Sequence, residues 1–146
     1  MASERGPIDL IRLEGEGNSV IVSVAGRLSS QDPALRDVLA GEIVIDTAFV
    51  RGSLETWIFP EDLTEWLASL DALDGGQDAA WREGRRAAEM VVELDPDGER
   101  AQVTVADRSM SLTSVTVTVV LTDAWFDDAY RRLDQVVRAW PAQESV

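Results

Sequence analysis

Residues 51–76 read RGSLETWIFPEDLTEWLASLDALDGG, a strand-like pattern that runs directly into a helix-like pattern. Pro60 suits the first turn of a helix, and the two acids after it favour the positive end of the helix dipole, while Gly75-Gly76 ends the helix. Apolar residues recur on one side of this segment at Leu63, Trp66, Leu67, Leu70 and Leu73. The spacing predicts an amphipathic helix with Leu67 and Leu70 buried against a sheet.

Alternating apolar and polar residues predict strands on both sides of this helix. The turn-forming run Asp95-Pro96-Asp97-Gly98 separates two of them, and the polar stretch 77–86 predicts a loop. Asp32-Pro33 predicts a short helix or turn as far as Leu39, and a second long helix starts near Asp123. The expected strands cover residues 8–13, 19–28, 42–50, 53–59, 88–94, 101–107 and 112–121, with a turn at Arg51-Gly52.

The predicted fold class is α+β, with an antiparallel sheet of about seven strands and two main amphipathic helices packed on it. The length of 146 residues fits a single domain, 1–146, with an ordered core at about 8–140. The apolar pattern of residues 54–70 recurs in residues 117–133, an offset of 63 residues. This recurrence hints at a duplicated strands-then-helix unit.

Composition removes most of the side chains that enzymes use for catalysis. The chain has 27 acidic and 13 basic residues, all 13 bases are Arg, and it contains no Lys, His or Cys. An imidazole base, a thiolate and a Schiff-base amine are therefore absent. We expect no enzymatic activity, no catalytic residue, no metal site and no cofactor. The Asp95–Glu99 run is better explained as a hairpin turn than as a calcium loop.

The formal net charge of −14 bears on partners and compartment. Residues 41–78 alone contain nine acids and one base, Arg51. Such a field repels phosphate backbones and anionic membranes and attracts basic surfaces. We therefore expect a basic protein partner, no direct nucleic-acid binding and no membrane association. A start without an apolar signal region predicts a cytoplasmic protein. A solvated acidic surface without a partner is the alternative explanation of these charges.

Two segments could bind the partner. In the first, Trp57 could anchor an interface whose rim is formed by Glu55, Glu61, Asp62 and Glu65, all pointing toward solvent. The second is the predicted loop that carries Trp81, Arg82, Arg85 and Arg86. Its guanidinium groups could bind carboxylate or phosphate groups, or could pair with nearby acids. For both tryptophans, packing in the core remains an open alternative.

The chain resembles small immunity proteins of the WapI type in five stretches: Gly52–Trp57, Pro60–Leu63, Leu70–Leu73, Val92–Gly98 and Trp125–Leu133. Residues 9–15, DLIRLEG, and the PEDL motif are also similar to a family of small uncharacterised proteins from high-GC bacteria. The first resemblance implies a protein that neutralises a toxin by covering its active site. Its motifs are structural, so it transfers no functional residue.

The sequence therefore favours a non-enzymatic cytoplasmic protein-binding module, with an immunity protein against a basic toxin as its most specific form. The first alternative is an accessory protein of a biosynthetic or regulatory complex that recognises a peptide or an enzyme. The second is a small-ligand binder that uses a pocket between sheet and helices.

Overall fold

The computed structural model describes residues 6–29, 31–84 and 87–142. Within these residues the chain runs through four strands and a helix, and then repeats that order. The first half contains β1 (Ile8–Gly15), β2 (Asn18–Arg27), β3 (Leu39–Asp46), β4 (Arg51–Ile58) and α1 (Pro60–Asp74). The second half contains β5 (Ala79–Trp81), β6 (Ala88–Leu94), β7 (Arg100–Asp107), β8 (Ser114–Val120) and α2 (Asp123–Ala139).

The strands form two antiparallel sheets of four strands each, in the orders β1-β2-β3-β4 and β5-β6-β7-β8. The α+β class is confirmed, but the expected single sheet of about seven strands is wrong. Periodicity finds strands without saying which ones pair, and α1 separates β4 from β5 along the chain. The eighth strand, β5, lies inside the predicted 77–86 loop, and its three residues are too few to show an alternating pattern.

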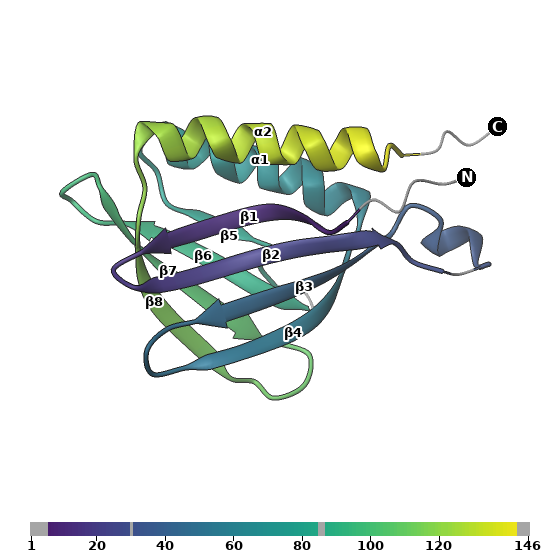
Figure 1. Cartoon of the computed structure of the whole chain (residues 1–146), viewed down its shortest axis with the longest axis horizontal. Coiled ribbons are helices and arrows are strands. Elements are labelled where there is room, and N and C mark those ends of the chain that lie inside the picture. The colour runs from purple at the N-terminus through teal and green to yellow at the C-terminus, as the bar shows by residue number, and fades with distance from the viewer. Residues whose placement is uncertain (1–5, 30, 85–86, 143–146) are drawn as a thin grey trace.

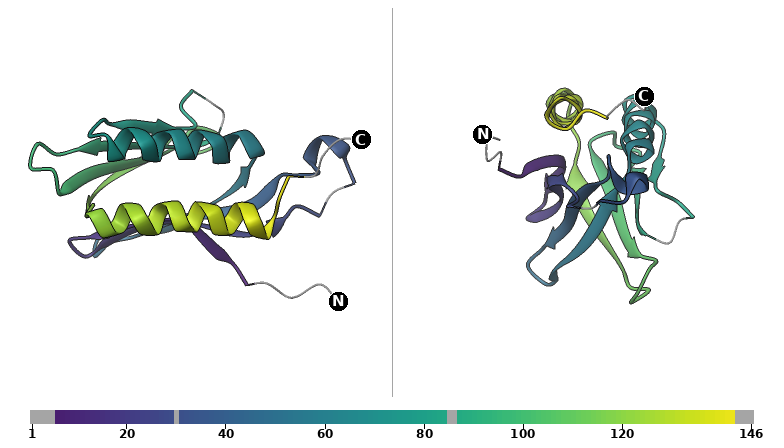
Figure 2. Two further views of the ribbon diagram at one scale, coloured as in Figure 1. Left: turned by 90° about the horizontal axis from the view of Figure 1, so that it is seen from above. Right: turned by 90° about the vertical axis from the view of Figure 1, so that its right-hand side faces the viewer.

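The two sheets lie face to face, and both helices cover the same side of them (Figure 1). Seen from above, α1 and α2 run side by side in opposite directions (Figure 2). Helix α2 packs along β1, and α1 packs along β5, so each helix borders a different sheet. Both termini of the described chain lie at the same end of the molecule.

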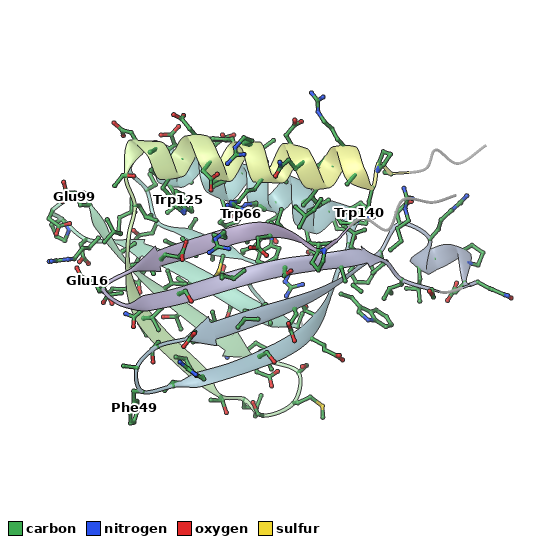
Figure 3. The ribbon with its side chains drawn as sticks, in the orientation of Figure 1. Glu16, Phe49, Trp66, Glu99, Trp125 and Trp140 are labelled. Carbon is green, nitrogen blue, oxygen red and sulfur yellow. The ribbon has the colours of Figure 1, made fainter. Side chains whose placement is uncertain are left out.

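The core lies between the sheets and under the helices. As the alternation predicts, Val20, Val22 and Val24 of β2 are fully buried, and so is Val119 of β8. Burying a side chain of this size contributes about 1.5–3 kcal/mol. Trp66 and Trp81 meet edge to face in this core with ring centroids 5.9 Å apart, and Figure 3 shows where Trp66 and Trp125 lie beneath the helices.

Helix α1 has the predicted bounds but a different buried side. It buries Leu70 and Leu73 as expected, together with Asp62, Trp66 and Ser69. Leu67, however, keeps 43% of its surface exposed, so its predicted burial is wrong. The physical reason is the neighbouring helix, because part of the apolar stripe faces α2 across a groove instead of facing the sheet. The short helix or turn expected after Asp32 is a 3₁₀ helix, Pro33–Leu35, and it ends before the expected Leu39, where β3 begins.

The two halves repeat with the spacing seen in the sequence. Strand β4 starts at residue 51 and β8 at residue 114, while α1 starts at residue 60 and α2 at residue 123. Both pairs are therefore 63 residues apart. The repeated strands-then-helix order is present in the fold, and each half contributes one sheet and one covering helix.

Candidate functional site

The outer face of the first sheet carries an exposed aromatic side chain beside two carboxylates. Trp57 on β4 is 51% exposed, and Glu55 projects from the same face of that strand. The register of β3 with β4 places Glu42 directly opposite Glu55, and Ala40 opposite Trp57. We call Glu42, Glu55 and Trp57 the outer-face patch. It borders a shallow depression of about 420 Å³.

The charges of the outer-face patch are unbalanced. Two like charges directly opposite each other on neighbouring strands destabilise a sheet. Among the described residues, neither Glu42 nor Glu55 has an ion-pair partner. Several small side chains also line the depression, including Ser23, Ala25 and Ala40, and the indole and the two carboxylates are exposed.

The structure does not bring the whole predicted acidic rim to the surface. Glu61 is exposed in the first turn of α1, but Asp62 is almost fully buried. The Asp62 carboxylate accepts a hydrogen bond of 2.9 Å from the backbone N–H of Phe59 and thereby caps the helix. Glu65 is half-buried and accepts a hydrogen bond of 2.8 Å from the backbone N–H of Arg82. The expectation that Asp62 and Glu65 point toward solvent is therefore wrong.

The alternative binding loop is also not an exposed basic surface. Trp81 belongs to β5, and both Trp81 and Arg82 are 1% exposed. Arg85 and Arg86 lie outside the described residues. Of the alternatives that the sequence left open, Trp81 packs in the core. Arg82 lies beside it, among acceptors from both halves of the chain and near the Asp62 carboxylate.

Arg82 joins the two halves of the molecule. Its guanidinium donates hydrogen bonds to the carbonyl of Ala88 (3.0 Å), the carbonyl of Trp57 (2.9 Å) and the hydroxyl of Thr56 (2.8 Å). It also lies 3.8 Å from the Asp62 carboxylate and 4.6 Å above the Trp81 ring. A buried guanidinium is tolerated only when its donors are satisfied in this way. Arg82 therefore has a structural role, and part of that role is to hold the backbone of Trp57.

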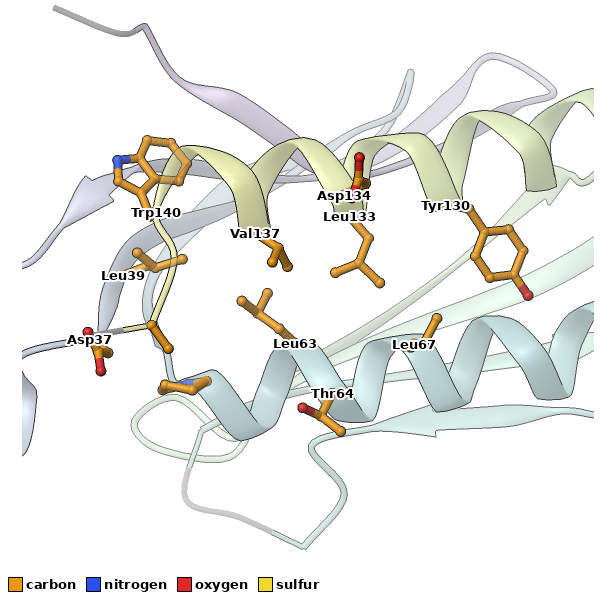
Figure 4. A pocket seen from close by; sticks show the side chains of 12 residues that line it. Asp37, Leu39, Leu63, Thr64, Leu67, Tyr130, Leu133, Asp134, Val137 and Trp140 are labelled. Atoms are coloured by element: carbon orange, nitrogen blue, oxygen red, sulfur yellow. The ribbon is translucent and has the colours of Figure 1, made fainter. Parts of the chain in front are cut away.

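A second candidate site is the groove between the two helices (Figure 4). It has a volume of about 440 Å³, and most of its side chains are apolar. The phenol of Tyr130 on α2 donates a hydrogen bond of 2.7 Å to Asp71 on α1. Partial burial and this hydrogen bond raise the pKa of Tyr130 to about 12. The apolar side chains of the groove come from Leu39, Pro60, Leu63, Leu67, Leu133, Val137, Trp140 and Ala142.

The described residues contain no cluster of three or more acidic side chains arranged to hold a metal ion. In the turn after β6, the Asp97 carboxylate accepts hydrogen bonds from the backbone N–H groups of Glu99 (3.0 Å) and Arg100 (3.1 Å). These bonds lower the pKa of Asp97. They are typical of a hairpin turn, as the sequence predicts for this run.

The chain matches the model of a family of unknown function, DUF5959, over residues 8–141. It belongs to that family. No curated protein and no solved structure matches this DUF5959 chain. In the described part of the chain, neither helix has the length and apolar character needed to cross a membrane.

Sequence reasoning missed two parts of the candidate sites in this DUF5959 member. Glu42 belongs to the outer-face patch because it lies opposite Glu55, and only the strand register reveals that pairing. The groove requires the relative position of two helices that are separated by half the chain. In the structure, Leu67 of α1 and Val137 of α2 are half-exposed because both side chains line this groove.

Proposed function

We propose that the chain is a non-enzymatic protein-binding module that binds a basic protein partner on the outer-face patch. The observation that carries the proposal is the exposed Trp57 beside the facing carboxylates of Glu42 and Glu55, which form no ion pair with any residue that the structure describes. Within the isolated molecule this arrangement is unfavourable. A cationic partner would relieve the repulsion and bury the indole, which combines an aromatic anchor with a charged rim.

The hydrogen bonds that hold the backbone around Trp57 also support this proposal. Arg82 donates to its backbone carbonyl from inside the molecule, and the neighbouring Thr56 hydroxyl accepts from the same guanidinium. The strand that presents the indole is thereby held before a partner arrives. Preorganisation of this kind lowers the entropy that binding must overcome. The net charge of −14 favours a basic partner by accelerating encounter.

In its most specific form, the proposal is an immunity protein that neutralises a basic toxin in the cytoplasm. The resemblance to WapI-type proteins supports this form, and an acidic inhibitor suits a basic, nuclease-like toxin. An accessory protein of a biosynthetic or regulatory complex would use the same patch for a different partner. The identity of the captured partner separates these two forms.

The test is affinity capture from the native host with the wild-type chain and with Trp57→Ala as bait, followed by mass spectrometry. A partner retained only by the wild-type chain is then measured by surface plasmon resonance at low and high salt. Glu55→Arg should slow association most at low salt, and Trp57→Ala should speed dissociation by about tenfold or more, equivalent to about 1.4 kcal/mol.

Glu93→Arg is the matched control, because Glu93 is an exposed acid on β6, in the other sheet. It makes the same change in net charge and should alter association much less than Glu55→Arg. Equal effects of the two reversals would mean that overall charge, and not this patch, drives the encounter. Unchanged kinetics in Glu55→Arg and Trp57→Ala would remove the outer-face patch as the binding surface.

A second candidate function is the binding of an apolar small molecule in the groove between the helices. Its support is the groove's volume of about 440 Å³ and its apolar lining. The neutral dye Nile red tests it, because its fluorescence rises in apolar surroundings. Saturable fluorescence should fall in Leu67→Asp but persist in Ala68→Asp, a neighbouring exposed position outside the lining. Equal fluorescence in both variants would place the dye elsewhere.

A further inference from the structure

Three large apolar side chains project almost fully into solvent from two turns. Phe49, in the turn between β3 and β4, is 94% exposed. Met110 and Leu112, in the turn between β7 and β8, are 85% and 76% exposed. Both turns project on the side of the molecule away from the helices (Figure 1), and Figure 3 shows Phe49 at the tip of the first one. The two turns lie at opposite ends of this side in Figure 1, so the three residues form two separate exposed apolar groups.

Hydrogen bonds fix the conformation of both turns. In the first, the Thr47 hydroxyl oxygen accepts from the backbone N–H groups of Phe49 (3.0 Å) and Val50 (2.7 Å). In the second, the buried Asp107 carboxylate accepts from three successive backbone N–H groups and two serine hydroxyls, all between residues 109 and 111. These hydrogen bonds hold the pKa of Asp107 well below its usual value, so the carboxylate stays ionised.

The second turn also contains backbone strain. Leu112 has a φ of 58°, in the left-handed region that bulky side chains rarely occupy. Such strain persists only where the surrounding hydrogen bonds impose it, and it concentrates at functional positions. Here the clamp around Asp107 imposes a conformation in which Met110 and Leu112 point into water. If this turn only connected two strands, burial of Met110 and Leu112 would be the more favourable arrangement.

An apolar cleft opens between the two sheets and extends between these turns. It has a volume of about 210 Å³, and its lining includes residues of both turns, Val50 from the first and Ser111 and Thr113 from the second. The rest of its apolar lining comes from the inner faces of both sheets and consists of Ile43, Ile45, Leu54, Val105 and Val115.

Two edge strands, β4 and β8, border the cleft. Among the described residues, β4 pairs only with β3, and β8 pairs only with β7. Arg82 already occupies the carbonyl of Trp57, and the Asn18 side chain occupies the carbonyl of Thr118. The segments 51–55 and 114–116 are therefore the parts of these edges that can accept another strand. An open edge of this kind is a template for an added extended segment.

Charge distinguishes this end of the molecule from the outer-face patch. Arg51 is paired with Asp46 at 2.8 Å, and Arg108 is paired with Glu89 at 3.0 Å. The guanidinium groups near the cleft are thus balanced within the chain, although the molecule as a whole carries −14. The ionised Asp107 carboxylate also lines the cleft, but five donors of its own turn already surround it. With these charges compensated inside the chain, the surface that complements the remaining apolar lining is an uncharged, apolar one. A second copy of the chain would bring another −14, which opposes self-association.

We propose that the cleft between β4 and β8, with Phe49, Met110 and Leu112 at its ends, binds an extended, uncharged, apolar segment of another protein by strand addition. The backbone of the segment hydrogen-bonds to one of the open edges. Its alternate side chains enter the cleft, and the clamped turns cover them. This site shares strand β4, including the backbone of Glu55, with the outer-face patch, but it uses the edge of the strand and takes a partner of different chemistry.

The test starts with selection from a random nonapeptide phage-display library on the full chain. Enriched peptides should carry little charge and alternate apolar with polar residues. Their affinity is then measured by fluorescence anisotropy. Binding should weaken at least tenfold for Met110→Ser/Leu112→Ser and for Phe49→Ser, and at least tenfold when the central peptide residue becomes Pro, which cannot donate to a strand ladder. Trp57→Ala, outside the cleft, should leave it unchanged.

Hydrogen exchange distinguishes strand addition from nonspecific hydrophobic adsorption. Bound peptide should slow amide exchange in residues 51–55 or 114–116, and circular dichroism of each variant checks that it folds. The proposal is overturned if no peptide depends on the three apolar residues, or if the enriched peptides are basic and depend on Trp57. It is also overturned if the wild-type chain forms a dimer that these substitutions abolish. Flotation with phosphatidylcholine vesicles that depends on Phe49 would instead assign the turns to a bilayer.

Discussion

The cluster around Arg82 and the outer-face patch combine the same kinds of residue with opposite results. Both place a tryptophan beside charged side chains, and the hydrogen bond from Arg82 to the Trp57 carbonyl connects them directly. In the cluster, opposite charges are buried together and the guanidinium donors are satisfied. In the patch, like charges face each other and the indole remains in water. The cluster stabilises the fold, whereas the facing carboxylates of the patch repel each other. In our proposal, a bound basic partner relieves that repulsion.

The largest expected effect comes from removing the buried guanidinium. Arg82→Met should lower the free energy of unfolding by about 3–5 kcal/mol, because the buried Asp62 carboxylate loses its ion-pair partner and two buried carbonyls lose their donor. Chemical denaturation measures the change. Arg51→Met is the matched control, since Arg51 is exposed and its pair with Asp46 should contribute at most about 1 kcal/mol. Similar losses in both variants would contradict the structural role of Arg82.

A second comparison on α1 tests burial without charge. Leu70→Ala should cost about 2–5 kcal/mol, the usual range for a fully buried leucine. Leu67→Ala, three residues earlier, should cost markedly less because much of its side chain faces the groove. Denaturation curves of the two variants give the difference. Equal losses would mean that the groove is closed in solution and that the stripe packs as the sequence alone suggests.

A smaller effect of opposite sign is expected in the outer-face patch. Glu55→Arg should raise the free energy of unfolding by about 0.2–1 kcal/mol at low ionic strength, because it replaces repulsion of Glu42 with attraction. Salt should reduce the gain. A loss of stability in Glu55→Arg would show that the two carboxylates do not face each other across the strands.

The smallest expected effect is on the titration of Tyr130, which does not change the stability at neutral pH. Tyr130 is the only tyrosine, so phenolate absorbance reports its titration directly. The midpoint should lie near a pKa of about 12, and Asp71→Asn should lower it toward 10. Because the folded pKa is raised, this phenol stabilises the fold fully below about pH 10, and that contribution disappears as the pH rises through about 12. A wild-type midpoint near 10 would contradict the Tyr130–Asp71 hydrogen bond.

The local structure was predictable because each element shows its own periodicity. Alternation in β2 and β8 and the stripes of α1 and α2 depend on neighbours within a few positions, and these elements lie close to their expected bounds. The assembly of the elements was not predictable. That the strands divide into two sheets depends on α1 directing the chain to the other layer, and no short window of sequence contains that information.

The candidate site shows the same limit at the level of single residues. The sequence expected a turn at Arg51-Gly52, whereas the β3–β4 turn spans residues 47–50. With the turn at Arg51-Gly52, the acid at position 55 would face Ala48, and the pairing of Glu55 with Glu42 could not be seen. Nothing in the sequence near Asp62 or near Arg82 indicates that these charged side chains are buried. They meet only when the second half of the chain folds against the first.

The contacts between α2 and β1 join the two ends of the described chain and so affect the order of folding. Every strand pairs with a neighbour in sequence, so each sheet can form through short loop closures, a topology associated with low contact order and fast folding. Trp125 breaks this rule: its indole N–H donates to the carbonyl of Arg12, 113 residues away. Docking of α2 on β1 therefore has the longest loop to close. It is the step we expect to limit the folding rate, and a nascent chain cannot complete it until α2 has left the ribosome.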